Sequence, residues 1–309
     1  IVASLSALLV LPPFSLGLVG PLYAHLIASA ITAALCLWLW RQYHEPAAAP
    51  AHSFASMLRQ SLPVLGVSLV GMSMATVDRY SIRWLLGPAA VAFYAVSFQV
   101  AALLSFGGAA VRTSLLSKLI ANAANRPVIG IYFRHYLVCG SMFAVALAAL
   151  APEIVHVLAG AKYDSNVQLV PMLCAAILAL ELYSFGQALA VARRSPQQAF
   201  YSIAAGAAVA LLLVPALCYW LGAPGVPLGL LAGYSVAAAA LLARHAPFGW
   251  RAGAWLAFAG LVFAALAADY SNPGHSWASW VPAIRYLLAA GAAGLGLASL
   301  RHLGKGAST

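Results

Sequence analysis

The chain has 309 residues, of which 64% are hydrophobic and only 7% are charged, and its mean hydropathy is +0.92. A water-soluble domain is about half apolar and about one quarter charged, so this composition excludes an ordinary soluble protein and predicts an all-α polytopic membrane protein. The formal net charge of +10 does not indicate nucleic acid as a partner. The basic residues stand singly or in pairs between apolar runs, as they do in loops that face anionic membrane lipids.

The four cysteines and the start of the chain carry little chemistry. The cysteines lie inside apolar runs, form no CxxC pair and have no histidine cluster nearby, which indicates small buried apolar residues. We therefore expect no metal site and no cofactor. The chain begins at Ile1 without a basic leader, so we expect its first apolar run to be the interior of a longer protein and not a signal peptide.

Ten membrane spans are expected along the chain, because a helix needs about 20 apolar residues to cross the hydrocarbon layer. The first 40 residues contain no Asp, Glu, Lys or Arg, and prolines and glycines divide them near residues 18–20 into two spans, 1–18 and 21–40. The later spans are predicted over 61–86, 89–117, 133–152, 167–191, the two parts of 195–243 on either side of the GAPG turn, 250–268 and 281–300.

The basic residues alternate between the two sides of this arrangement. Cytoplasmic loops of membrane proteins collect Lys and Arg. If the connection at 41–60 is cytoplasmic, 12 of the 16 basic residues fall on its side: Arg41, Arg59, Arg112, Lys118, Arg126, Arg134, Arg193, Arg194, Arg244, Arg251, Arg301 and Lys305. The alternation holds through all ten spans and supports their number.

The predicted helix after the GAPG turn has a face of small residues. Gly225, Gly229 and Gly233 form a GxxxGxxxG pattern, which lets membrane helices approach closely. Static packing and a sliding contact both fit this pattern, and static packing is the more common use.

Glu181 lies near the middle of its predicted span, in LALELYSFGQALA. An ionised carboxylate is costly to bury in lipid, and desolvation favours the protonated acid unless a cation pairs with it. Two interpretations stay open. Glu181 either carries a coupling proton or binds a counter-cation, or it is a neutral acid that hydrogen-bonds to a neighbouring helix.

Asp78, Arg79 and Arg83 stand together in the apolar stretch TVDRYSIRWLLG. On a helix the two arginines are four residues apart and share a face, while Asp78 points about 100° away from Arg79. One interpretation is that both arginines face a water-filled cavity and bind the diphosphate of a substrate. The other is that they extend to the outer membrane interface, with Tyr80 and Trp84 in the aromatic belt.

Two further polar residues are weaker candidates. Gln99 lies in the middle of the next predicted span and fits the lining of the same cavity. Arg112 lies near the inner end of that span and also fits an interface anchor. No HExxH, GxSxG or GxxxxGK[ST] motif occurs, so we predict no catalytic residues.

The stretch VDRYSIRWLLGPAAVAFYAVSFQVA resembles the DR-x5-LLG-x4-G-x-Y-x2-A segment of polysaccharide and O-antigen flippases, the polysaccharide biosynthesis proteins of the multidrug/oligosaccharidyl-lipid/polysaccharide exporter superfamily. The segments LRQSLPVLGVSL, APEIVHVLAGAKYDSNVQLVPMLCAAILAL and QALAVARRSPQQAFYSIAAGAAVALLLVPAL are similar to further parts of that family. The resemblance covers residues 1–245, and the last two spans more weakly.

The resemblance implies that the chain is the truncated remainder of a 12–14-helix transporter with two lobes. Residues 1–60 would be the end of the first lobe with a cytoplasmic connection, residues 61–245 the second six-helix lobe, and residues 246–309 two extra spans with a cytoplasmic tail. The implied function is transport of undecaprenyl-diphosphate-linked oligosaccharide across the bacterial cytoplasmic (inner) membrane by alternating access, for polysaccharide, O-antigen and lipopolysaccharide biosynthesis, with a proton or sodium ion as the coupling ion in several members.

For the site, the resemblance favours the cavity interpretation of Arg79 and Arg83. From their positions in the sequence, we predict Asp78 and Gln99 as further substrate-binding residues and Glu181 as the ion-coupling residue. A multidrug/cation antiporter or a peptidoglycan-precursor flippase of the same superfamily is the nearest alternative. A membrane enzyme that acts on lipid-linked sugars, such as a polymerase, ligase or acyltransferase, is the second. Such enzymes usually have a large outward loop, whereas the outward loops predicted for this chain are short. We therefore expect a transporter and not an enzyme.

Overall fold

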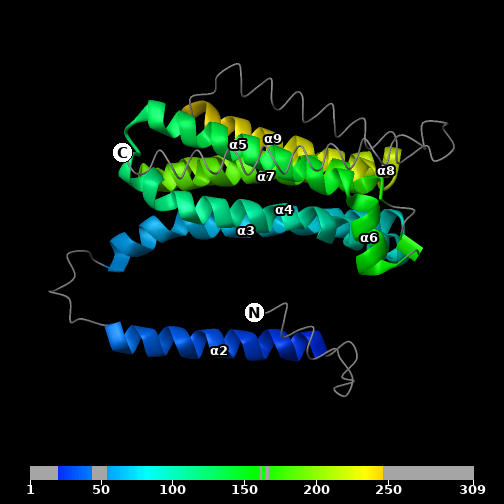
Figure 1. Cartoon of the computed structure of the whole chain (residues 1–309), viewed down its shortest axis with the longest axis horizontal. Coiled ribbons are helices and arrows are strands. Elements are labelled where there is room, and N and C mark those ends of the chain that lie inside the picture. The colour runs from blue at the N-terminus through cyan, green and yellow to red at the C-terminus, as the bar shows by residue number, and fades with distance from the viewer. Residues whose placement is uncertain (1–19, 44–53, 161, 164–166, 246–309) are drawn as a thin grey trace. The chain divides into compact units, whose positions relative to one another are not determined.

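The computed structural model describes residues 20–43, 54–160, 162–163 and 167–245, and the secondary structure in these ranges is helical, without a strand (Figure 1). This confirms the predicted all-α class. The chain divides into two units, Ile1–Met57 and Leu58–Thr309. The spans expected over 1–18, 250–268 and 281–300 lie outside the described residues, so the number of ten spans stays a prediction.

The first unit contains α2 (Gly20–Tyr43), which matches the span expected over 21–40. Its described side chains are mostly exposed, among them Leu26, Trp38 and Trp40. Arg41 lies in the last turn, where a cation interacts favourably with the carbonyl end of a helix.

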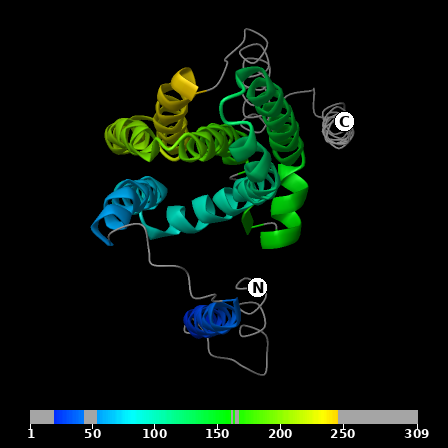
Figure 2. The same ribbon diagram turned by 90° about the vertical axis from the view of Figure 1, so that its left-hand side faces the viewer.

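The second unit contains six long helices among the described residues. They are α3 (Phe54–Leu85, which begins within the first unit), α4 (Pro88–Ala121), α5 (Arg126–Ala149), α7 (Leu169–Ala192), α8 (Pro196–Leu221) and α9 (Gly225–His245). Each contains a stretch that is long and apolar enough to cross a membrane, which agrees with the spans expected in this part. Seen nearly end-on in Figure 2, these helices run side by side.

Several helices extend beyond the predicted spans. The predictions began at 61 and 133, whereas α3 begins at Phe54 and α5 begins at Arg126. A helix of 34 residues such as α4 is about 51 Å long, against about 30 Å of hydrocarbon, so its ends extend into the polar layers. Asn125 caps α5 by accepting a hydrogen bond from the backbone N–H of Val128. Hydropathy marks the hydrocarbon boundary, while caps mark the helix boundary.

A short helix, α6 (Ala151–Ala159), was not predicted as a separate element. Pro152 lies in the first turn of α6, where a backbone N–H would have no helical partner, so its absence costs this helix nothing. The same missing N–H cannot continue the preceding helix α5, which therefore ends before it. The helix buries Ala151 and Val155 and exposes Val157 and Leu158. Figure 1 shows that it crosses the direction of the long helices. The exposed apolar side chains suit a helix that lies at the membrane interface.

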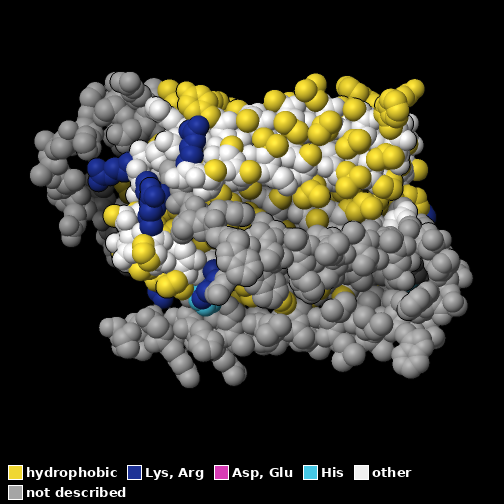
Figure 3. All heavy atoms as spheres, turned by 90° about the horizontal axis from the view of Figure 1, so that it is seen from above, with side chains coloured by type: hydrophobic (Ala, Val, Ile, Leu, Met, Phe, Trp, Pro, Cys, Tyr) yellow, Lys and Arg dark blue, Asp and Glu magenta, His cyan; other side chains and the backbone are white. Residues whose placement is uncertain are grey.

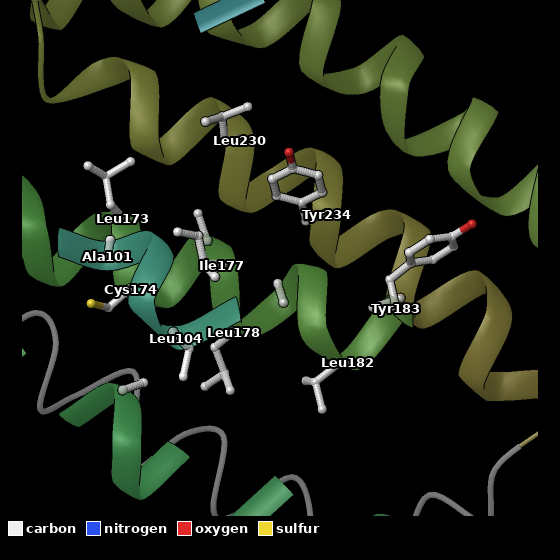
Figure 4. Packing of buried hydrophobic residues seen from close by; sticks show 14 of the residues in the cluster. Ala101, Leu104, Leu173, Cys174, Ile177, Leu178, Leu182, Tyr183, Leu230 and Tyr234 are labelled. Carbon is white, nitrogen blue, oxygen red and sulfur yellow. The ribbon is translucent and has the colours of Figure 1, made fainter. Parts of the chain in front are cut away.

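Helix α7 is the centre of the unit and α3 is at its edge. Of the apolar stretch in α7, 78% of the residues are buried, against 17% in α3. Figure 4 shows why: Leu178 of α7 lies toward Leu104 of α4, whereas Ile177 and Tyr183 lie on the side of α9, near Tyr234. A helix that contacts neighbours around most of its circumference is apolar on every face, as the α7 sequence is.

Helices α8 and α9 pack backbone to backbone through the predicted glycine face. A methyl group added at Gly229 would lie 2.8 Å from the Cα atom of Val214, and one added at Gly233 would lie 2.7 Å from the Cβ atom of Ala210. At Gly225 it would overlap the carbonyl of Leu217. The structure therefore confirms a close helix contact at GxxxGxxxG.

We expect Gly233→Leu to destabilise the protein by about 1–3 kcal/mol, because the added side chain forces α8 and α9 apart. Thermal unfolding of the purified protein in detergent measures this effect. The matched control is Gly71→Leu on α3, where an added Cβ meets nothing within 4 Å. Equal stability of the two variants would contradict the tight contact.

The two ends of the unit differ in chemistry. Arg193, between α7 and α8, donates from Nε to the carbonyl of Ala123, between α4 and α5, at 2.9 Å. Desolvation, and then the nearby Arg126, lower the pKa of Arg193. Two of the predicted basic connections therefore lie together. On the described surface visible in Figure 3, most Lys and Arg side chains gather toward one end, and hydrophobic side chains predominate toward the other.

Aromatic residues mark the helix ends away from these basic turns. Trp84 at the end of α3 and Trp220 at the end of α8 are each 82% exposed, and Tyr80 and Tyr219 next to them are also exposed. Trp and Tyr gather where the hydrocarbon meets the headgroups. The basic turns and the aromatic residues therefore lie at opposite ends of these helices, and which end is cytoplasmic stays a prediction.

Candidate functional site

An ion pair and a tyrosine hydroxyl together join three helices of the second unit. Arg112 of α4 donates from Nη1 to Oε2 of Glu181 on α7 at 2.8 Å. The hydroxyl of Tyr136 on α5 donates to the same oxygen at 2.6 Å. The Glu181 side chain is 7% exposed and that of Arg112 is 27% exposed. The carboxylate thus has two donors, one of them cationic.

The sequence of α4 makes room for this ion pair. Leu104, Gly108, Arg112, Leu115 and Leu119 follow one another at intervals of three or four residues, so they share one face of the helix. That face packs toward α7, and a Cβ at Gly108 would overlap the Glu181 carboxylate. Glycine at this position therefore gives the carboxylate its space.

The ion pair shows whether a cation lies beside the buried Glu181 carboxyl group, which the sequence left open. A cation is present beside the carboxyl group, and it is Arg112, which fitted an interface anchor equally well. No sequence signal linked these residues, because they lie 69 positions apart. The only hint was the physical requirement that a buried carboxylate needs donors. The ion-coupling role of Glu181 stays a prediction.

A second carboxyl group is buried between α3 and α4. Asp78 is 0% exposed, and its Oδ2 accepts a hydrogen bond from the hydroxyl of Tyr94 at 2.8 Å. Its Oδ1 accepts one from the backbone N–H of Arg79 at 2.6 Å. Tyr94 is also 0% exposed. The fold therefore places Asp78 inside the helix contact, away from any surface where a substrate could bind in this state.

The two arginines of the same stretch lie on the outside of α3. Arg79 and Arg83 are exposed, and among the described residues neither forms an ion pair. The guanidinium carbon of Arg79 lies 5.1 Å from the centre of the Phe98 ring on α4, a distance typical of a cation–π contact. Gln99, next to Phe98, is exposed as well. Of the four predicted substrate-binding residues, Asp78 is thus buried, whereas Arg79, Arg83 and Gln99 are exposed.

Metal chemistry finds no support in the described part of the chain, where no group of three His, Cys, Asp or Glu side chains is placed to hold an ion. Cys174 and Cys218 are buried among apolar side chains, Cys139 is half-buried, and Cys36 is exposed. The two buried thiols agree with the interpretation of the cysteines as small apolar residues.

Comparison of the chain with protein-family models, with curated proteins and with solved structures gives no match. The family resemblance noted in the sequence therefore stays a hypothesis, and the function is argued from the described residues.

Proposed function

We propose that this chain belongs to a membrane transporter of the polysaccharide and O-antigen flippase type, which moves undecaprenyl-diphosphate-linked oligosaccharide across the bacterial cytoplasmic membrane by alternating access. The six apolar helices in the described part of the second unit support a multi-pass membrane protein. The observation that carries the choice of substrate is the distribution of charge on these helices. In the described spans the arginines Arg79 and Arg83 are exposed, whereas the carboxylates Asp78 and Glu181 are buried.

Exposed arginines on an apolar helix favour an anionic ligand. A guanidinium group donates two parallel hydrogen bonds to phosphate oxygens, and two guanidinium groups one helical turn apart match the two phosphates of a diphosphate. Gln99, exposed on α4, can add a neutral donor and acceptor for a sugar hydroxyl. A lipid-linked sugar needs such a polar path for its headgroup while its tail stays in lipid.

The same distribution disfavours the multidrug/cation antiporter. A site for a lipophilic cation needs an accessible carboxylate. Asp78 is 0% exposed and bonded to Tyr94, and Glu181 is paired with Arg112. Both acidic groups of the described spans therefore already bond to side chains of this chain.

Reconstitution of the purified chain in vesicles tests the proposal. We expect it to accelerate transfer of a fluorescent undecaprenyl-diphosphate-linked sugar between leaflets relative to empty vesicles, and to leave a lipophilic cation untransported. Mass spectrometry of the sugar lipid before and after the assay separates transport from an enzyme, which would change its mass. Transfer no faster than in empty vesicles would contradict the proposal.

A further inference from the structure

The two carboxyl groups that are buried in the described apolar helices differ in how their charge is compensated. Glu181 contacts the guanidinium group of Arg112 at 2.8 Å. No Lys or Arg side-chain nitrogen among the described residues lies within ion-pair distance of Asp78, although Asp78 is the more deeply buried of the two, at 0% against 5%. Burial of a charge without a counter-charge is strongly unfavourable. Asp78 is therefore the carboxyl group that is suited to exist as a neutral acid.

The surroundings of Asp78 come from three helices. From its own helix α3, the backbone N–H of Arg79 donates to Oδ1, and the Arg79 guanidinium group interacts with the carboxyl group at longer range. From α4, the hydroxyl of Tyr94 bonds to Oδ2. From α9, Tyr234 is near enough to interact electrostatically. Within the described part of the chain, the titratable or charged groups that interact with Asp78 are thus Tyr94, Tyr234 and Arg79.

We propose that Asp78 and Tyr94 form a proton-binding site, and that the proton it takes up is the ion coupled to transport. The proposal rests on the transport function given above and assigns the coupling to Asp78 in place of Glu181. A proton from the aqueous phase adds to Oδ2 and cancels the charge of the carboxylate. The new O–H group then donates to the oxygen of Tyr94, whose own hydrogen turns away. The pair is bonded in both states, because a tyrosine hydroxyl both donates and accepts.

A metal cation fits this place poorly. The backbone N–H of Arg79 already occupies Oδ1, and Tyr94 supplies only one further oxygen. Sodium and calcium bind several oxygen ligands, more than these two groups offer. The site therefore selects a proton.

The position of Asp78 on α3 connects the proton to a movement. Val67, Met74, Asp78 and Ile82 recur at intervals of four or seven residues and form the buried stripe of α3, which is otherwise largely exposed. Protonated, Asp78 keeps this stripe neutral and α3 stays against α4. Ionised, the carboxylate favours separation of α3 from α4, which admits water and allows the proton to leave. Proton binding and the position of α3 are thus linked.

Infrared difference spectroscopy on the reconstituted protein tests the site without any transport. A protonated carboxyl group has a C=O stretching band that carboxylates lack. We expect the wild type to show such a band, Asp78→Asn to lose it, and Glu181→Gln to retain it. Tyr94→Phe, which keeps the carboxyl group and removes its partner, should shift the band, and so provides the test if Asp78→Asn fails to insert. A spectrum in which neither variant alters a carboxyl band would overturn the proposal.

The vesicle assay tests whether proton binding at Asp78 is coupled to transport. An imposed pH gradient should change the transfer rate of the sugar lipid in the wild type and in Gly71→Ala, and should have no effect in Asp78→Asn. Transfer that responds equally to the gradient in Asp78→Asn refutes the coupling role. If the wild type moves no sugar lipid but the infrared band is present and lost in Asp78→Asn, the transport proposal fails while the proton site stands.

Discussion

Replacing Arg112 with alanine should destabilise the protein by about 3 kcal/mol, because it leaves the Glu181 carboxylate buried without a cation. Breaking a buried ion pair from one side costs about 3–5 kcal/mol, and we expect the lower end because the Arg112 side chain is still 27% exposed. The hydroxyl of Tyr136 remains as a donor to the carboxylate but carries no charge. Thermal unfolding of the purified variant in detergent measures the loss.

The origin of this loss can be separated from a general effect of removing arginine. Arg134→Ala, at an exposed position on α5, should change the stability by less than about 0.5 kcal/mol. Combining Arg112→Leu with Glu181→Leu removes both charges and should recover most of the stability, since apolar side chains of similar size often replace a buried ion pair without loss. A double variant as unstable as Arg112→Ala would show that the charge of Glu181 is not the cause.

Replacing both Arg79 and Arg83 with alanine should reduce transfer of the sugar lipid about a hundredfold while leaving insertion intact. Each guanidinium bond to a charged phosphate is worth about 1.5 kcal/mol or more, which is about tenfold in binding for each residue. Neither side chain forms an ion pair with a described residue, so the fold loses little. The fluorescence assay of leaflet transfer gives the rate, and gel filtration reports the amount of folded protein.

Two further variants test whether the loss of transfer comes from the guanidinium groups at these positions. Lysine at both positions keeps the charge but lacks the planar fork, so transfer should be intermediate between the wild type and the alanine variant. Lys162→Ala removes an exposed cation outside the apolar helices and should transfer at the wild-type rate. Unchanged transfer in the double alanine variant would assign both arginines to the membrane interface, beside Tyr80 and Trp84.

Much of the helical arrangement follows from hydropathy, and its details follow from residues that hydropathy ignores. The spans between 61 and 245 were predictable because each has about 20 apolar residues, and the contact of α8 with α9 because Gly225, Gly229 and Gly233 recur every four residues. Helix α6 was missed because Pro152 reads as a break in an apolar run, whereas it also suits the first turn of a new helix.

The candidate site was less predictable, because side chains distant in the sequence decide it. Glu181 was recognisable as a buried charge in a span, but its partner Arg112 is on another helix and resembled an interface anchor. Asp78 was grouped with Arg79 and Arg83 by sequence proximity. On the helix it faces α4 while they face outward, since adjacent residues are rotated by about 100°. The rotation between adjacent helical residues predicts that Asp78 and Arg79 lie on different faces of the helix, but it does not predict which neighbouring helix each face contacts.

The proposed transport requires that Arg79 and Arg83 bind the diphosphate of a lipid-linked sugar in water-accessible surroundings. Cysteine substituted at each position, in a protein whose Cys36, Cys139, Cys174 and Cys218 are replaced by alanine, can be labelled with a membrane-impermeant thiol reagent in vesicles. We predict labelling at both positions that the undecaprenyl-diphosphate-linked sugar blocks and undecaprenol does not. Labelling that the sugar lipid leaves unchanged, or none from either side of the membrane, would contradict the account.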